Sequence, residues 1–233
     1  MTMGRAEATS AQRAPDAPTT PPCWDRRRTI ALVSPVALIA STYMVFQVGV
    51  DRLGERWGYL TGFVFFWVVW CLALPTALLG WRGVHRLLRP APVPRPRGLW
   101  ATLLALPMVG GFATVFVPAL ATLTLAAFVL VIGIAIVNAT CEEILWRGLY
   151  AELFAGRWVA GWLYPAVAFT LWHISPAAVT GGRTADFWLG TAFIGLVFGW
   201  VAYKTTSIRW TTLAHIILNA MGPGFAMLIL YGQ

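Results

Sequence analysis

Long apolar runs separated by short charged loops make up most of the chain after residue 28. A predominantly apolar helix of about 20 residues can cross the hydrocarbon core of a bilayer. The pattern therefore predicts an all-α, polytopic membrane bundle of seven or eight transmembrane helices. The count depends on whether Gly222-Pro223-Gly224 divides the last run, because proline interrupts helices. The predicted spans are Thr29–Val50, Trp57–Trp81, Leu99–Leu120, Leu123–Phe154, Gly161–Ser175, Phe187–Tyr203 and Ile208–Leu230.

The positive charges predict the orientation of these helices. Loops rich in Lys and Arg stay in the cytoplasm, and the loop over 82–97 holds five arginines. This loop and the N-terminus, where Arg26–Arg28 precede the first span, are therefore predicted to be cytoplasmic. If the helices alternate, the loops near 157 and 204–209 lie on the same side. The loops at 51–56 and 180–186, where acidic residues partly balance the arginines, lie outside.

Composition narrows the class of protein. The chain is 58% hydrophobic and 11% charged, with a mean hydropathy of +0.69, which excludes an ordinary soluble domain. The net charge of +8 does not indicate a nucleic-acid partner, because the arginines lie in the tail and short loops, where they act as topology signals. We expect a disordered basic cytoplasmic tail at 1–28, N-terminal transmembrane helices at 29–120, and a further transmembrane core at 121–233, in a multi-pass protein of the cell membrane.

Two adjacent carboxylates and an arginine lie within the fourth predicted span. Ionisable side chains within a membrane helix are costly and usually face a partner or a water-filled cavity. Glu143 and Arg147 have the i, i+4 spacing of an ion pair on one helix face. Glu142 is rotated by about 100° from that face and is predicted to face a cavity. The sequence therefore predicts a polar site inside the membrane domain.

Two of the three histidines also lie in apolar runs. A single histidine in such a run is more often a satisfied core residue than a catalyst. However, His173 and His215, with Asn219 one turn after His215, accompany the carboxylates in a chain that has few other polar groups there. At 1.5 Å per residue, Glu142 and His173 lie roughly 18 Å from the cytoplasmic ends of their helices and His215 roughly 10 Å. The groups can therefore meet.

These residue types indicate peptide hydrolysis. A glutamate beside a histidine in a low-dielectric pocket can act as a general base toward water. Imidazole and amide groups can stabilise a tetrahedral oxyanion by donating hydrogen bonds. We predict that Glu142 and His173 activate water, and that His215 and Asn219 are the oxyanion donors.

The motifs Glu142-Glu143-xxx-Arg147, Phe169-xxx-His173 and His215-xxx-Asn219 resemble those of the CPBP membrane proteins. That family includes the type II CAAX prenyl endopeptidases and the bacterial Abi and lysostaphin-resistance-like proteins. The resemblance covers roughly 123–222 and implies an eight-helix intramembrane endopeptidase. It assigns water activation to the first glutamate and first histidine, oxyanion stabilisation to the second histidine and the asparagine, and supporting roles to Glu143 and Arg147. Its substrate would be a membrane-embedded or membrane-associated peptide or protein in the lipid bilayer. Nothing in the sequence identifies a prenyl pocket.

Two alternatives remain open from the sequence. Glu142, His173 and His215 are an acceptable zinc set on chemistry alone, but no two of them have a compact metal-binding spacing, so we favour a mechanism without a cofactor. A non-catalytic membrane immunity or scaffold protein would use the polar residues to lock helices together. That explanation suits Glu143 with Arg147, but it leaves Glu142 without a cationic partner.

Overall fold

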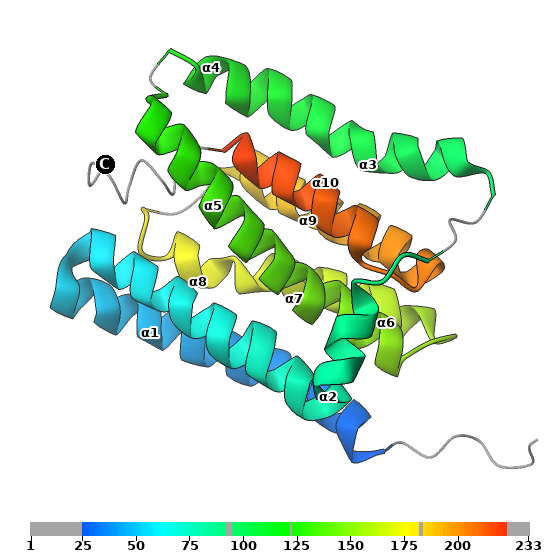
Figure 1. The fold of residues 1–233 in the computed structure, drawn as a ribbon. Helices are drawn as coiled ribbons and strands as arrows, with labels where there is room; N and C mark the ends of the chain where they lie inside the picture. The colour runs from blue at the N-terminus through cyan, green and yellow to red at the C-terminus, as the bar shows by residue number, and fades with distance from the viewer. Residues whose placement is uncertain (1–24, 92–94, 122, 182–183, 223–233) are drawn as a thin grey trace, which may run out of the picture.

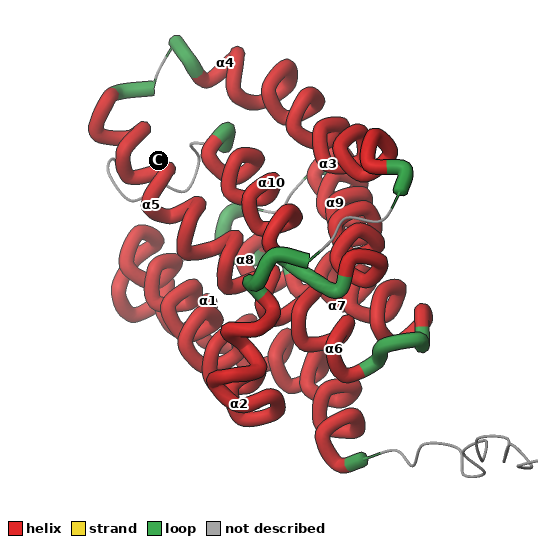
Figure 2. Tube along the Cα trace, turned by 45° about the vertical axis from the view of Figure 1, so that its right-hand side comes forward, coloured by secondary structure: helices red, strands yellow, loops and turns green. Residues whose placement is uncertain are grey.

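A computed structural model describes residues 25–91, 95–121, 123–181 and 184–222, and these residues form helices and connecting loops without strands (Figures 1 and 2). The sequence prediction of an all-α fold is confirmed. The α-helices are α1 Arg26–Phe65, α2 Leu74–Leu87, α3 Arg97–Gly111, α4 Val117–Ala119, α5 Leu125–Glu142, α6 Tyr150–Leu153, α7 Tyr164–Trp172, α8 Ile174–Ala177, α9 Ala185–Thr205 and α10 Arg209–Ala220. The π-helical stretches are η1 Phe66–Ala73, η2 Phe112–Phe116, η3 Glu143–Leu149 and η4 Val159–Leu163.

The first element is a hairpin rather than one straight helix. Gly54 has φ 76° and ψ 166°, a conformation that favours glycine, and the chain reverses there (Figure 1). The two arms then pack closely, because a Cβ on Gly58 would lie only 2.2 Å from the backbone nitrogen of Val50. The turn lies between the two spans that the sequence predicts at 29–50 and 57–81.

Four continuous helical stretches among the described residues are long and apolar enough to cross a membrane. They are Arg26–Leu87, Arg97–Ala119, Leu125–Leu153 and Ala185–Thr205, and the first contains the reversal at Gly54. A total of seven or eight helices stays a prediction. The fifth predicted span, Gly161–Ser175, is divided between η4, α7 and α8, and α10 has only 12 residues. The end of the last predicted span lies at 223–233, outside the described residues.

The bundle has two ends. We call the end with the start of α1, the α2–α3 connection, the α6–η4 turn and the α9–α10 turn the arginine end. The opposite end, called here the far end, has the Gly54 turn, the α4–α5 and α8–α9 connections and the last turn of α10 (Figure 1). The helix begins at Arg26, inside the segment predicted as a tail, and residues 1–24 lie outside the described residues.

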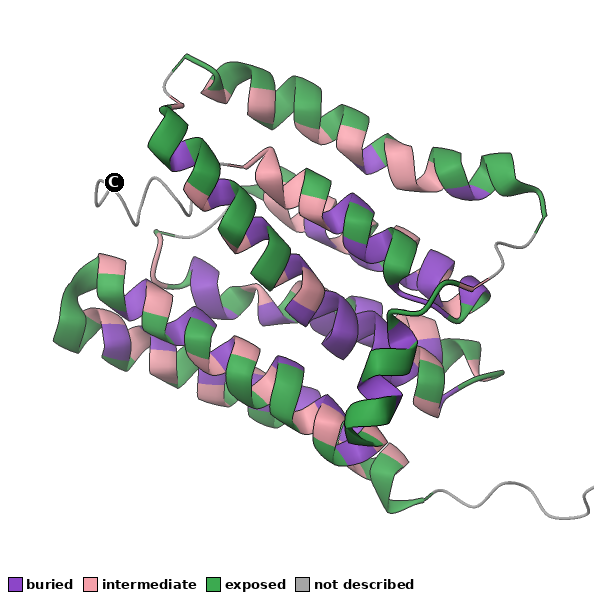
Figure 3. Ribbon diagram, in the orientation of Figure 1, coloured by how far each residue is buried: buried purple, intermediate pink, exposed green. Residues whose placement is uncertain are grey.

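The hydrophobic core lies between α1, η1, η3, α6 and α7 (Figure 3). The indole of Trp172 stacks on the ring of Phe66 with centroids 4.0 Å apart. Tyr150 is fully buried, and its hydroxyl donates a 2.7 Å hydrogen bond to the carbonyl of Ala31. This side-chain bond joins α6 to the first turns of α1 and holds the arginine end of the bundle together.

Gly195 and Gly199, four residues apart on α9, lie at close helix contacts. A Cβ on Gly195 would lie 3.1 Å from the carbonyl oxygen of Ala166, and one on Gly199 would lie 3.0 Å from Cδ1 of Trp162. The small residues therefore allow α9 to approach η4 and α7, which carry His173 at their end.

Candidate active site

The two glutamates lie where α5 passes into η3. Both are buried, with 2% of Glu142 and 0% of Glu143 exposed. Glu142 is the last residue of α5 and lines a cavity, whereas Glu143 begins η3 and lies outside the residues that line the cavity. Insertions of π-helix into α-helices are frequent at functional sites. Adjacent positions thus give the two carboxylates different surroundings, as their helical rotation predicts.

The predicted ion pair between Glu143 and Arg147 is present. Nη1 of Arg147 lies 3.3 Å from Oε1 of Glu143, and the guanidinium lies over the ring of Phe169 at 4.1 Å from the centroid. Among the described residues, neither terminal nitrogen of Arg147 has a hydrogen-bond acceptor. The buried positive charge is therefore compensated by one carboxylate and one aromatic face.

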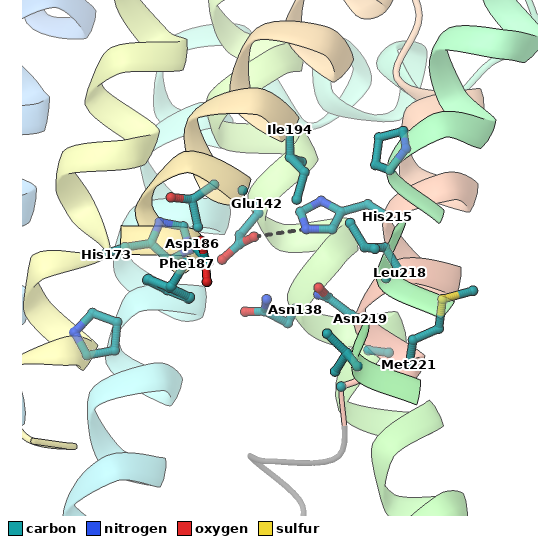
Figure 4. Close-up of a pocket in the computed structure, with 18 of the residues that line it drawn as sticks. Asn138, Glu142, His173, Asp186, Phe187, Ile194, His215, Leu218, Asn219 and Met221 are labelled. Atoms are coloured by element: carbon teal, nitrogen blue, oxygen red, sulfur yellow. Dashed lines mark ion pairs between the residues drawn. The ribbon is translucent and has the colours of Figure 1, made fainter. Parts of the chain in front are cut away.

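His215 contacts both glutamates. Its Nδ1 lies 2.9 Å from Oε1 of Glu143, and its Nε2 lies 3.5 Å from Oε2 of Glu142 (Figure 4). A carboxylate oxygen accepts hydrogen bonds. Nδ1 of His215 therefore carries a proton and donates a hydrogen bond to Glu143. The sequence prediction placed His215 and Asn219 near Glu142 and His173 as hydrogen-bond donors. The structure places His215 in direct contact with the Glu142 carboxyl.

His173 lies at the break between α7 and α8 rather than within a continuous helix, which corrects the expectation of one uninterrupted span. Pro176 explains the break, because it has no N–H to bond the carbonyl one turn earlier. Nδ1 of His173 donates a 2.8 Å hydrogen bond to the carbonyl of Phe169. In a neutral ring Nε2 is then the acceptor nitrogen. In Figure 4 the Glu142 carboxyl lies between His173 and His215, and all three line the same cavity.

Asn219 lies one helical turn after His215 on α10 and also lines the cavity. The structure thus brings four residues of the predicted site, Glu142, His173, His215 and Asn219, to the wall of one cavity (Figure 4). The two predicted supporting residues, Glu143 and Arg147, lie directly behind this wall, where Glu143 contacts His215.

Asn138 is a site residue that sequence reasoning missed. It lies one turn before Glu142 on α5 and lines the same cavity, where Figure 4 shows its amide near the Glu142 carboxyl. Its Oδ1 accepts a 2.8 Å hydrogen bond from the indole N–H of Trp67. An asparagine four residues before the glutamate in an apolar run was the available signal. The indole nitrogen of Trp67 thus orients the Asn138 amide toward the site.

The cavity is large, with a volume of about 1280 Å³. It lies between α1, α3, α5, α9 and α10, and its walls are mainly apolar, as in many ligand sites. Polar side chains gather at its two extremes. Glu142, His215 and Asn138 form the inner group, and Figure 4 shows Asp186 beside this group, next to His173. Glu55 lies at the far end of the bundle, next to the Gly54 turn.

Among the described residues, no group of three or more His, Cys, Asp or Glu side chains is arranged to hold a metal ion. Zinc held by Glu142, His173 and His215 stays the alternative to a mechanism without a cofactor, and elemental analysis would decide between them.

Comparison with protein families gives one match. Residues 122–221 match the family described as Type II CAAX prenyl endopeptidase Rce1-like. The match confirms the resemblance predicted from the three motifs, and it runs from α5 to the end of α10, which includes every predicted site residue. Comparison with curated proteins and with solved structures gives no significant match. The family implies endopeptidase activity in a membrane protein.

Proposed function

We propose that this chain, whose residues 122–221 match the type II CAAX prenyl endopeptidase family, is an intramembrane endopeptidase that uses Glu142 to activate water. The observation that carries the proposal is the position of Glu142. Its carboxyl is 2% exposed, lines a cavity large enough for a peptide segment, and lies beside two histidines. A buried carboxylate is costly, and its place at a cavity wall suits a general base.

In the proposed reaction a water lies between Glu142 and His173. Glu142 accepts a proton from the water as its oxygen attacks the scissile carbonyl carbon. Nε2 of His173 orients the water, because Nδ1 is engaged by the carbonyl of Phe169. When the carbon–nitrogen bond breaks, Glu142 returns the proton to the leaving amine. The products are a new carboxyl end and a new amino end.

The oxyanion is stabilised from the α10 side of the cavity. Asn219 offers its amide N–H groups, and His215 offers Nε2–H when the ring carries a second proton. In that form Glu143, 2.9 Å from Nδ1, compensates the positive charge of the ring. Glu143 in turn is paired with Arg147. The buried network thus supports a donor that preorganises the site for the developing negative charge.

A non-catalytic scaffold or immunity protein is the second candidate. The buried pair of Glu143 with Arg147, covered by Phe169, has the features of a structural contact between helices. That function needs neither the cavity nor a carboxyl at its wall. The open space in front of Glu142 favours the endopeptidase.

Proteolysis can be tested directly with purified protein in detergent. We would incubate it with a mixture of membrane-derived peptides and identify new peptide ends by mass spectrometry. Glu142→Gln should remove those ends. The matched control is Glu152→Gln, the same change ten residues later on the same helical stretch, where the side chain is exposed. New ends that persist with Glu142→Gln would refute the proposal, and an absence of new ends with all three proteins would favour the scaffold.

A further inference from the structure

We infer that the cavity is reached from the extracytoplasmic side of the membrane, so that the substrate is an apolar peptide segment presented on that side rather than a cytoplasmic C-terminal tail. This inference rests on the proposed function, because the protein has a peptide substrate only if it is an endopeptidase. It depends on three observations: one end of the bundle is closed, the other is open to the cavity, and the two ends differ in charge.

The arginine end is closed beneath the glutamates. Every residue of η3, from Glu143 to Leu149, is buried, and Tyr150 and Phe154 continue this packing to the end of the helix. Hydrogen bonds also tie the loops of this end together. The amide of Ile208 donates to the carbonyl of Leu87 at 3.1 Å, and the hydroxyl of Ser207 donates to the carbonyl of Arg89 at 2.9 Å.

The cavity extends from Glu142 to the far end. Along α5 it is lined by Ile134 and Ala135, and across from them by Ile194 of α9. Toward the far end its lining includes Glu55, next to the Gly54 turn, and Asp186 in the first turn of α9. Both of these residues are exposed. The described structure therefore connects the Glu142 carboxyl with the far end.

The charges of the two ends are strongly unequal. Among the described residues, all Lys, Arg, Asp and Glu side chains at the arginine end except Asp25 and Glu152 are basic, whereas the far end carries both signs of charge. By the bias of Lys and Arg toward cytoplasmic loops, the arginine end is cytoplasmic and the mouth of the cavity is extracytoplasmic. The basic residues at the arginine end are Arg26, Arg27, Arg28, Arg82, Arg86, Arg89, Arg95, Arg97, Arg157, Lys204 and Arg209, and the described charged residues at the far end are Asp51, Arg52, Glu55, Arg56 and Asp186.

The depth of Glu142 defines what must enter. The α5 residues that line the cavity run from Val131 to Glu142, a rise of roughly 16 Å along the helix. An extended peptide covers about 3.3 Å per residue, so a segment that enters from the far end needs roughly five residues within the cavity to bring its scissile bond to Glu142. The mainly apolar walls suit a segment taken from a membrane-anchored or membrane-inserted peptide.

Thiol labelling in oriented membrane vesicles tests the inference without any turnover. The background would carry Cys23→Ser, because Cys71 and Cys141 are buried, and its own labelling would be measured first. Single cysteines would then be introduced as Ile194→Cys inside the cavity, Thr184→Cys at its mouth and Arg157→Cys at the arginine end. The probe is a small, permanently charged methanethiosulfonate that does not cross bilayers.

We expect Ile194→Cys and Thr184→Cys to react in right-side-out vesicles and to lose this reaction in inside-out vesicles, with Arg157→Cys showing the reverse. Reaction of Ile194→Cys only from the cytoplasmic side, or from neither side, would overturn the inference. So would reaction of Thr184→Cys and Arg157→Cys from the same side. Adding Glu142→Gln to each variant should leave labelling unchanged, so that loss of proteolysis and wrong sidedness give separate results.

Discussion

The helical stretch from Leu125 to Leu153 consists of two halves that differ in packing. In α5 only every fourth residue is buried up to the polar site, at Ala127, Val131, Ala135 and Ala139, and the remaining positions face the surroundings or the cavity. In η3 every residue is buried. Glu142 and Glu143 lie on either side of this boundary. The polar site therefore lies where the packed core meets the cavity. As a result, the Glu142 carboxyl faces the cavity and the Glu143 carboxyl faces the protein interior.

The largest expected effect comes from removing the base on the cavity side. Glu142→Ala and His173→Ala should each abolish proteolysis, with a fall in kcat of at least about 10²–10⁴, the range for general acid–base catalysis. Single-turnover assays with a cleavable peptide would measure it, and unchanged detergent melting curves would show that the fold is kept. Near-native turnover in either variant would remove that residue from the water-activating role.

A smaller loss is expected at His215, which contacts the glutamates from α10. Without its Nε2 donor, kcat should fall by roughly 10²–10³ while KM changes little, as for loss of one oxyanion donor. The native protein and the His215→Ala variant together also test whether activity requires a metal ion. If Glu142 and His173 act without a cofactor, a chelator should leave activity intact and elemental analysis should find no stoichiometric zinc. Stoichiometric zinc that disappears together with activity in His215→Ala would instead indicate a metalloprotease.

Substitution of Glu143 should mainly lower the stability of the fold rather than the catalytic rate. Glu143→Gln leaves the buried guanidinium of Arg147 without its carboxylate, and breaking one partner of a buried pair costs about 3–5 kcal/mol. We expect a clear fall in the melting temperature or in the yield of folded protein. The isosteric Glu142→Gln should melt near the native temperature and lose turnover. The reverse pattern would show that the roles assigned to the two halves are exchanged.

The smallest effect is expected where α5 contacts η1. Trp67→Phe removes the indole N–H that holds Oδ1 of Asn138, so the amide beside Glu142 loses its fixed orientation. One hydrogen bond contributes about 1 kcal/mol, or roughly a fivefold change in kcat. Trp70→Phe is a matched control, because its indole donates instead to Ser41 of α1. Equal kcat in Trp67→Phe and native protein would show that Asn138 needs no such support.

Several features of the protein could be predicted from the sequence because they depend on periodicity and composition. Apolar runs predicted the helices, four of them long and apolar enough to cross a membrane, and the spacing of four predicted the Glu143–Arg147 pair. The three motifs predicted the resemblance to the family that residues 122–221 match. The candidate site residues could be identified because polar side chains within an apolar membrane helix are costly and usually have a partner or a function.

Tertiary structure alone decided which groups meet and which of them line the cavity. Helical rotation separates Glu142 from Glu143, but only the packing of α10 against α5 brings His215 within 2.9 Å of one and 3.5 Å of the other. The partnership of Trp67 with Asn138 joins residues 71 positions apart, which no local pattern encodes. The cavity is likewise a property of several helices together: its open and closed ends depend on where their side chains fill space, and a one-dimensional pattern of polar and apolar residues carries no record of that volume.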